Sequence, residues 1–446
     1  MGDYTVTNYA FFKTAISAIT LTTVLAGCME MPPMPSMGEL PFMNKTAEDA
    51  PQNVLSPEMA TGEESVVINS LLERRSVLPD GPFATVADAV LDANSRAAEA
   101  ELRAARLRAE AASTNWLPTL GPQISLTSLG SVVAGLVVEQ ALFDNGRRKA
   151  EREYAVADVE VAAVALAQDT NQRVLTALEL YLRAEENRAT AAVNAAAMER
   201  MNHFAYIMRE RVRGGVSNRA DLQIVEQKLN QMQSDLMSDR EEADAAIAEL
   251  NAMSAYSVSD VSGLSALAAT SIISIPLSVA KSQAEASRQI AEAKIARAGY
   301  LPGLSATGSV TNSGSDFNLG AVIPNGIGFG NAAAREAIEA QSQAAESKVA
   351  QTREDTNRQL RALESELASL QRQAEQARSI ASQAAANYDI FASQLREGQR
   401  TVNDVVGVFE TKVRTERAMV AFPYQIALVE LKIAAIQGAL VDGGRI

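Results

Sequence analysis

Groups that carry chemistry are scarce in this sequence. Its 446 residues include one cysteine, one histidine and one tryptophan, and only 5% are aromatic. With a single thiol, neither a disulfide framework nor a cysteine metal site can form. The lone histidine, His203, lies in a helical stretch, and we interpret it as a surface or packing residue of that helix. The net charge of −14 argues against nucleic acid as a ligand, because phosphates require a basic surface. We therefore expect no catalytic site, no metal and no cofactor.

The single cysteine ends a short apolar segment. Residues 14–25 are largely apolar, and "LAGC" closes the segment at Cys28. This run is shorter than the roughly 20 residues of a transmembrane helix, and it has the layout of a signal peptide. Small residues directly before a cysteine resemble the lipobox of bacterial lipoproteins, which implies a signal peptide over 1–27 and acylation of Cys28. Met29 follows, where aspartate would signal inner-membrane retention, so the resemblance favours the outer membrane. The alternative is an ordinary secretory signal with a chance cysteine.

The next residues show no sustained periodicity. Residues 28–83 are rich in Met, Pro, Glu and Ser, which predicts an extended tether after the lipid anchor. Helical spacing begins near Thr85 and predicts one long helix from there to Leu117-Pro118, because proline cannot continue a helix.

The remainder of the chain is an internal repeat. A shift of about 184 positions aligns three pairs of segments in the same order. The pairs are 115–121 with 299–305, 141–151 with 327–337, and 211–228 with 394–411. Any one match is weak, but three at a nearly constant offset indicate a tandem duplication. We place the two repeats at 84–262 and 263–446.

Each repeat has the same order of predicted elements: a helix, a β-hairpin, a very long helix, a glycine turn and a returning helix. The hairpins are expected at about 117–143 and 301–329, the long helices at 147–213 and 331–397, and the turns at about 213–218 and 396–402. Neither long segment contains Gly or Pro, and each would be about 100 Å long at 1.5 Å per residue. Charged residues along both segments exclude a membrane span.

This plan resembles the TolC family of outer-membrane channel proteins over residues 84–440. The segment "LFDNGRRKAE" (142–151) is close to the family's Phe-Asp-x-Gly-Arg at the strand-to-helix junction, and "LVELKIAAIQGAL" (428–440) is similar to its last helix. The second repeat departs from the pattern, with Ala332 and Ala333 at the expected Gly-Arg. The resemblance implies a mainly α fold with a small β part, a trimeric 12-stranded barrel and a long α-helical periplasmic tunnel. Pro423 interrupts the last helix, where we expect a kink rather than a stop.

Elementary physics agrees with this resemblance. Two hairpins give four strands, which cannot close a barrel, and an open sheet edge is excluded from lipid. Three copies would give twelve strands, a number compatible with a closed, water-filled barrel. The alternative is a coiled-coil rod with two loops, acting as a lipid-anchored scaffold without a channel.

In the family, the glycine turns form the periplasmic tip, where adaptor proteins dock. The docking candidates are Gly214, Gly215, Val216, Ser217, Gly398, Gln399 and Thr401. The family's pore-facing carboxylate matches Asp404, and a trimer would turn it into a ring of three that favours cations. Arg400 and Asp221 match positions where the family joins its inner and outer coils by an ion pair. The alternative is that these are solvated charges at helix ends.

The resemblance thus implies a passive exit duct in the cell outer membrane, without enzyme activity. Its partners would be two further copies of the chain, outer-membrane lipid, a periplasmic adaptor (membrane fusion protein) and an inner-membrane RND or ABC pump. Two uses remain open: efflux of small compounds, which the lipobox favours slightly, and type I protein secretion.

Overall fold

The computed structural model describes residues 55, 65–93, 97–126, 132–268, 275–312 and 314–446. The chain divides into two units, residues 1–52 and 53–446, and every described residue belongs to the second. The expected signal peptide and Cys28 lie outside the described residues.

The duplicated unit is confirmed. The first repeat consists of α3 (Ala97–Ser113), β1 (Thr119–Leu126), β2 (Val132–Phe143), α4 (Arg147–Arg213) and α5 (Arg219–Ala252). The second consists of α6 (Leu277–Ala298), β3 (Gly303–Thr311), β4 (Gly314–Val322), α7 (Asn331–Arg396) and α8 (Val402–Gln437). Three short helices flank them: α1 (Val66–Leu72), α2 (Pro82–Leu91) and the 3-10 helix η1 (Gly443–Arg445).

The two hairpins join into one antiparallel sheet in the order β1-β2-β3-β4. Strands β2 and β3, one from each repeat, pair from Gly135 opposite Thr311 to Phe143 opposite Leu304. A Cβ at Gly135 would collide with the carbonyl oxygen of Val310, so this close approach requires glycine. Among the described strands, β1 and β4 are each paired on one side only.

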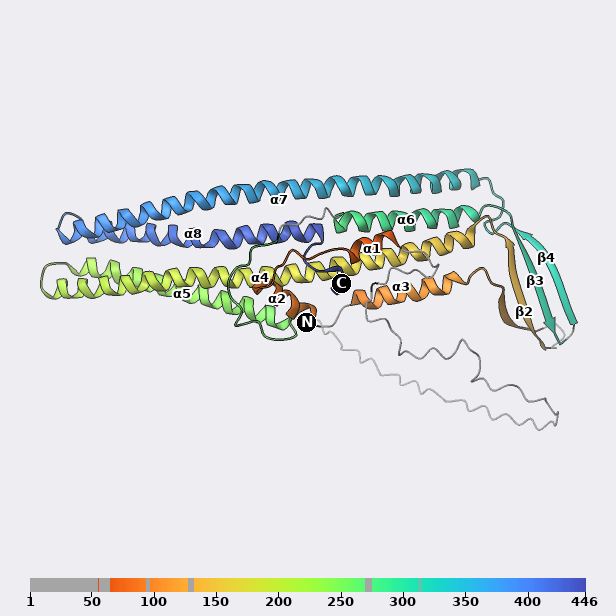
Figure 1. Ribbon diagram of the computed structural model, residues 1–446, viewed down its shortest axis with the longest axis horizontal. Helices are drawn as coiled ribbons and strands as arrows, with labels where there is room; N and C mark the ends of the chain where they lie inside the picture. Colours follow the sequence, from red (N-terminus) through yellow and green to blue (C-terminus); the bar gives the residue numbers. More distant parts are fainter. Residues whose placement is uncertain (1–54, 56–64, 94–96, 127–131, 269–274, 313) are drawn as a thin grey trace, which may run out of the picture. The chain divides into compact units, whose positions relative to one another are not determined.

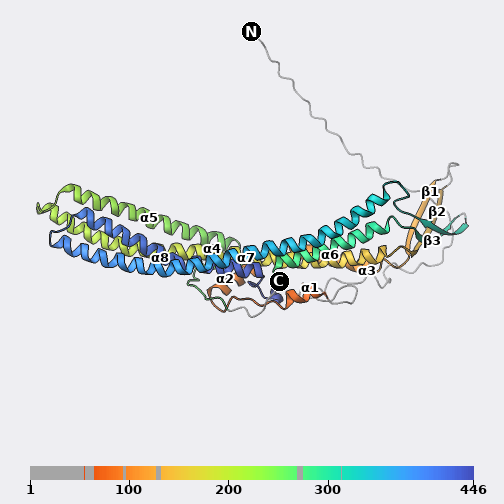
Figure 2. The same cartoon turned by 90° about the horizontal axis from the view of Figure 1, so that it is seen from above.

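The helices run side by side away from the sheet (Figure 1). The sheet lies where α4 and α7 begin, and the glycine turns lie at the opposite end of these helices, as Figure 2 also shows. Helix α4 has 67 residues and packs against α3, α5, α6 and α8. Helix α7 has 66 residues and packs against α6 and α8. The long helices therefore separate the sheet from the turns by about 100 Å at 1.5 Å per residue.

The main apolar core surrounds the middle of α4. Phe83 of α2 meets Tyr181 of α4 edge to face, with ring centroids 6.1 Å apart. The Tyr181 hydroxyl donates a hydrogen bond of 2.7 Å to the carbonyl oxygen of Gly263. A second cluster lies nearer the turns and includes Met208, Val225 and Phe409.

The described part of the predicted tether is folded, which corrects the expectation for residues 65–83. Ile68 and Leu71 of α1 are 0% exposed, and the Ser65 hydroxyl accepts the Ile68 N–H at the start of that helix. Arg74 is also buried, and its guanidinium donates to the carbonyl oxygens of Gln437 (2.7 Å) and Ile275 (2.6 Å). Burial lowers the pKa of Arg74 to about 10. Helix α1 is too short for its periodicity to stand out in the sequence, and only packing reveals it.

The single helix predicted from Thr85 is also wrong, because α2 and α3 are separate. Helix α2 ends at Leu91, followed by Asp92, whose backbone N–H still bonds Asp88. Side chains such as Asp and Asn compete for backbone hydrogen bonds and favour helix ends. Arg445 of η1 pairs with both Asp88 and Asp92 and fixes this end of α2.

Helix α8 continues through Pro423, so proline does not stop it. By length and composition α8 could cross a bilayer, and it is the one such helix among the described residues. Its apolar residues, however, contribute to the helical packing: Phe409 and Leu431 are buried, and α8 lies against α4 and α7. We therefore assign its apolarity to helix packing.

Candidate functional site

The sheet has two chemically different faces. Residues directly opposite each other in an antiparallel pair share a face, and the register places Leu120 beside Val138 and Leu136 beside Val310. The large apolar side chains exposed on this face are Leu120, Ile124, Leu136, Val138, Leu304, Val310, Phe317 and Leu319. Four strands therefore present one continuous apolar surface, and nothing in the described part of the chain covers it.

The opposite face is mainly polar, although Val133, Val137 and Val322 also lie on it. One row across it reads Thr119, Glu139, Thr307, Asn318 along the paired strands. Asp316 lies on the same face, opposite Ser309. None of the four described strands contains Lys or Arg, so the charge on this face of the described sheet is only negative. A sheet that is apolar on one side and polar on the other, with alternating residues, has the pattern of a membrane barrel wall.

The first strand-to-helix junction is built from the "FDNGRR" segment. Both carboxylate oxygens of Asp144 accept backbone N–H groups, from Gly146 (3.0 Å) and Arg148 (2.9 Å), at the start of α4. Asn145 (φ 54°) and Gly146 (φ 81°) take left-handed conformations, which lets the chain turn sharply there. The Asn145 amide donates to the Pro302 carbonyl oxygen (2.9 Å) and so joins the two repeats.

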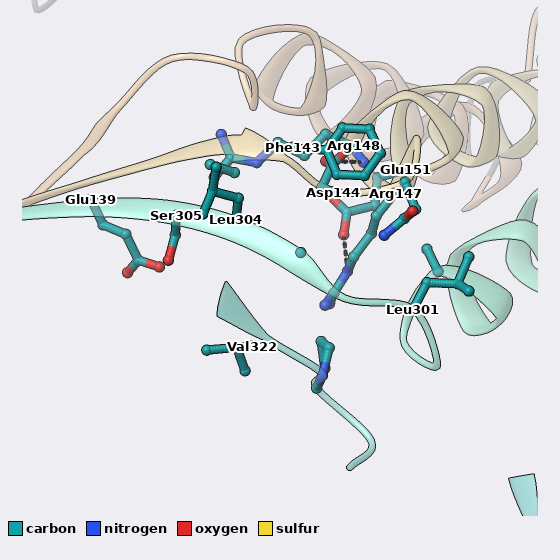
Figure 3. Close-up of a pocket in the computed structure, with 15 residues that line it drawn as sticks. Glu139, Phe143, Asp144, Arg147, Arg148, Glu151, Leu301, Leu304, Ser305 and Val322 are labelled. Carbon is teal, nitrogen blue, oxygen red and sulfur yellow. Dashed lines mark hydrogen bonds and ion pairs between the residues drawn. The ribbon is translucent and has the colours of Figure 1, made fainter. Parts of the chain in front are cut away.

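A cleft of about 410 Å³ lies at this junction (Figure 3). Its lining runs from Glu139 on β2 to Val322 on β4, with Arg147 and Arg148 at the helix start. Arg147 pairs with Glu151 at 3.0 Å, and Arg148 donates to the Asn115 carbonyl oxygen at 2.6 Å. These side chains are engaged in shaping the turn, which favours a structural role for the family-like motif.

The first glycine turn connects α4 to α5. Gly215 has φ 74°, a conformation that favours glycine, while Gly214 has φ −79°. Val216 projects from the turn and is 68% exposed. Ser217 accepts a hydrogen bond of 3.2 Å from Arg211 Nε. Asp221 lies in the first turn of α5, where its N–H donates to the Asn218 side chain.

The second glycine turn connects α7 to α8 and is followed by a different kind of helix cap. Gly398 has φ 79°, and the Gln399 N–H donates to the Gln394 carbonyl oxygen at 2.8 Å. Thr401 and Asp404 then form a capping box: the Asp404 N–H donates to Thr401 Oγ1, and the Thr401 N–H donates to Asp404 Oδ2. The Thr-x-x-acid spacing in the sequence is typical of this cap.

The capping box lowers the pKa of Asp404 and so favours its charged form. Its carboxylate is exposed and accepts hydrogen bonds from the Thr401 hydroxyl (2.8 Å) and N–H (3.1 Å). These bonds, with a smaller contribution from the charge of Arg400, lower the pKa of Asp404 below its ordinary value. The negative charge is therefore retained at pH values where an ordinary aspartate begins to protonate.

Within one chain, Arg400 and Asp221 are not joined: no ion pair between them occurs among the described residues. Arg400 Nε donates to Gln394 Oε1 at 3.0 Å, and its guanidinium lies 4.4 Å from the centre of the Phe391 ring. The predicted ion pair between the inner and outer coils therefore remains a prediction for the assembled protein, where Arg400 of one copy can meet Asp221 of another.

Other ion pairs connect α5 and α8 within the chain, and the sequence did not reveal them. Lys228 Nζ lies 2.6 Å from Glu410 Oε1, and Arg417 lies 2.8 Å from Asp239. The buried Asp239 also accepts a hydrogen bond of 2.6 Å from the Asn194 amide of α4. These residues are far apart in the sequence, so only the packing of the two helical hairpins brings them together.

Comparison with known proteins gives similarity in structure but not in sequence. No protein-family model and no curated protein matches the chain. A crystal structure of a membrane protein from Pseudomonas aeruginosa superposes with a TM-score of 0.73 at 16% identity, covering 84% of this chain and 93% of that one. For the outer membrane protein VceC of Vibrio cholerae the TM-score is 0.68 at 15% identity, covering 80% and 96%. For the open state of the MtrE outer membrane channel of Neisseria gonorrhoeae it is 0.68 at 14% identity, covering 83% and 91%. These similarities confirm the mainly α fold with a small β part that the family resemblance predicts for the single chain, whereas the trimer and the 12-stranded barrel remain predictions.

Proposed function

Because the chain has the fold of TolC-like outer-membrane channels, we propose that three copies form a passive exit duct through the outer membrane. The observation that carries this proposal is the two-faced sheet with its two open edges. Lipid cannot satisfy unpaired backbone groups, so the edges of β1 and β4 must pair. Pairing β4 of one copy with β1 of the next would close a barrel with the apolar face toward lipid and the polar face toward water.

The helical part would continue this duct into the periplasm. Helices α4 and α7 are long enough to extend about 100 Å from the sheet. The duct has no energy source of its own in this proposal. Transport would be driven by an inner-membrane RND or ABC pump, reached through a periplasmic adaptor that docks on the two glycine turns. The exposed side chain of Val216 and the left-handed backbone of Gly215 and Gly398 support docking there.

We propose efflux of small compounds as the use of the duct, supported by the lipobox-like segment before Cys28. Many efflux members of the TolC family are lipoproteins. Type I protein secretion remains the alternative. The genes beside this one would separate the two uses: an adaptor with a proton-driven pump supports efflux, and an adaptor with an ABC transporter and a secreted repeat protein supports secretion.

The lipid anchor has its own test. We expect the mature N-terminus to begin at an acylated Cys28, and Cys28→Ser to abolish lipid labelling and to slow or weaken outer-membrane assembly. A firm hold on the membrane needs two or more acyl chains. A mass spectrum of the wild-type N-terminus without acyl mass would show that this part of the proposal is wrong.

Assembly and conduction test the duct itself. The protein, extracted in mild detergent, should have the mass of a trimer and should form pores in planar bilayers. A monomer without conductance would instead support a lipid-anchored scaffold, since four strands alone leave two edges unpaired in lipid.

A further inference from the structure

The two repeats differ in how the sheet leads into the long helix. In the first repeat only residues 144–146 separate β2 from α4, but in the second, residues 323–330 separate β4 from α7. This longer connection, the 323–330 loop, carries two apolar side chains that nothing in the described chain covers. Ile327 is 89% exposed, and Phe329 is fully exposed.

The 323–330 loop is nevertheless anchored by hydrogen bonds. The Asn325 N–H donates to the Gly299 carbonyl oxygen (3.0 Å), which ties the loop to the end of α6. The Asn331 amide donates to the Gly326 carbonyl oxygen (2.9 Å), and Gly326 takes a φ of 64°. Ile327 and Phe329 are thus presented by a hydrogen-bonded loop rather than by a loose segment.

A complementary apolar pair lies at the other edge of the sheet. Trp116 and Leu117, which directly precede β1, are 60% and 42% exposed. The Trp116 carbonyl oxygen accepts a hydrogen bond of 3.0 Å from the Gln140 side chain of β2, which fixes this segment against the sheet. Strand β1 begins, and strand β4 ends, at the end of the sheet that adjoins the helices.

Strand direction brings these two pairs together in a closed barrel. The strands alternate in direction across the sheet, so β1 and β4 are antiparallel to each other. When β4 of one copy pairs with β1 of the next, the end of β4 therefore meets the start of that β1. The 323–330 loop then lies beside Trp116 and Leu117 of the neighbouring copy.

We propose that Ile327 and Phe329 of one copy pack against Trp116 and Leu117 of the next, and that this contact stabilises each seam of the barrel. The inference rests on the proposed trimer. The same contact cannot form within one chain, because β1 and β4 are three strand spacings apart, or about 14 Å. Covering both pairs removes two exposed apolar patches at once, which favours a second copy as the partner.

Disulfide cross-linking tests the proposal directly. We expect the double variant Leu117→Cys/Ile327→Cys, oxidised in outer membranes, to give covalent products up to a trimer. A disulfide needs Cα atoms within about 7 Å, so a bond within one chain is excluded. The single variants Leu117→Cys and Ile327→Cys show whether Cys28 forms a disulfide with either introduced cysteine. The double variant Leu117→Cys/Val216→Cys is the matched control and should not cross-link, because Val216 lies in the first glycine turn, at the other end of the long helices.

The only tryptophan of the chain provides a second measurement. In the wild-type trimer, Trp116 should emit at a shorter wavelength than in Phe329→Ser, where part of its cover is lost. Ile390→Ser, an exposed position on α7, should leave the emission unchanged. Phe329→Ser should also release monomers at a lower SDS concentration than the wild type.

Two outcomes would contradict the proposed contact without contradicting the proposed duct. The first is a conducting wild-type trimer in which the cysteine pair does not cross-link and Phe329→Ser leaves Trp116 emission unchanged. The second is strong quenching of Trp116 by brominated lipids together with absent cross-linking, which would assign both pairs to lipid. A wild-type monomer without conductance would instead contradict the proposed function itself.

Discussion

The two long helices are nearly equal in length but differ greatly in burial. Helix α4, with 67 residues, has buried side chains from Ala150 to Met208. Helix α7, with 66 residues, has only four among the described residues, namely Ala345, Thr356, Ala381 and Ala384. The cause is position: α4 lies between several helices, whereas α7 packs mainly against α6 and α8 among the described elements. Duplication produced two similar helices, and the fold gave them different neighbours.

This difference shows which surfaces of the described chain are left uncovered. Strands β1 and β4 are the open edges of the sheet, and α7 is an open side of the helical layer. The surface of α7 is suited to that position, because Ile380 and Ile390 are its only large apolar side chains that are strongly exposed. A polar α7 can face water or a neighbouring copy, whereas α4 must stay inside. Substitutions matched between the two repeats can test this comparison.

The largest effect is expected in the α4 core. Leu178 is 0% exposed, and Leu178→Ala should lower the free energy of unfolding by about 2–5 kcal/mol. Ile380 on α7 is 44% exposed, and Ile380→Ala should cost less than about 1 kcal/mol in the separated chain. Denaturant midpoints followed by circular dichroism would measure both. An equal cost for the two variants in the monomer would contradict the comparison, and a larger Ile380 effect in the trimer would show that a neighbouring copy covers α7.

The next effect concerns the two strand-to-helix junctions. Asp144 accepts two N–H groups at the start of α4, while no side chain caps the start of α7, whose N-cap is Gly330. Asp144→Ala should therefore destabilise the protein by about 0.5–2 kcal/mol, as loss of a helix cap does. Asp144→Asn keeps an acceptor and should retain most of the stability. A midpoint unchanged in Asp144→Ala would show that the cap does not contribute.

These junctions also show what could be predicted from the sequence. The repeat, the two hairpins and the glycine turns were visible because Gly, Pro and long periodic runs mark them locally. Helix α1 and the buried Arg74 were missed, because their positions depend on residues far away in the chain: α1 packs against α4 and η1, and Arg74 bonds Gln437 of α8 and Ile275. The capping box at Thr401 was present in the sequence as Thr-x-x-Asp, but the family resemblance drew attention to the charge alone.

A smaller effect is expected at the glycine turns if Arg400 of one copy pairs with Asp221 of another. Exposed ion pairs contribute about 0–1 kcal/mol each, but a trimer would contain three. Arg400→Ser and Asp221→Ala should each loosen the closed tip and raise single-channel conductance in planar bilayers. The double variant should add little to either single variant, because both remove the same interaction.

The control for this pair is an ion pair within the chain. Lys228 and Glu410 join α5 to α8 of one copy, so Lys228→Ala should affect stability more than gating. If conductance stays at the wild-type value in both Arg400→Ser and Asp221→Ala, the ion pair between copies is ruled out.

The smallest change in stability, but a specific change in selectivity, is expected at Asp404. Asp404→Asn removes the charge while keeping an acceptor for the Thr401 N–H, so it should reduce cation preference without widening the pore. Asp404→Ala is less suitable, because it also removes the capping box. Reversal potentials across a salt gradient would measure the change, and a wild-type value in Asp404→Asn would rule out a role for this carboxylate in selectivity.

The pH dependence separates the charge of Asp404 from its capping role. Hydrogen bonds from Thr401 lower the pKa of Asp404, so cation preference should persist as the pH falls below the ordinary pKa of aspartate and be lost only below the lowered pKa. Thr401→Ala keeps the carboxylate but removes the hydroxyl donor, which should raise the pKa toward its ordinary value. At neutral pH this variant should retain the wild-type reversal potential, and on acidification it should lose cation preference at a higher pH than the wild type.

The first repeat offers the matched control. There the Asn218 side chain caps α5 by accepting the Asp221 N–H, and it makes no hydrogen bond to the Asp404 carboxylate. Asn218→Ala should therefore leave the pH midpoint of cation preference unchanged. A midpoint that moves equally in Asn218→Ala and Thr401→Ala would mean that loosening either turn, rather than the hydrogen bonds to Asp404, sets the titration.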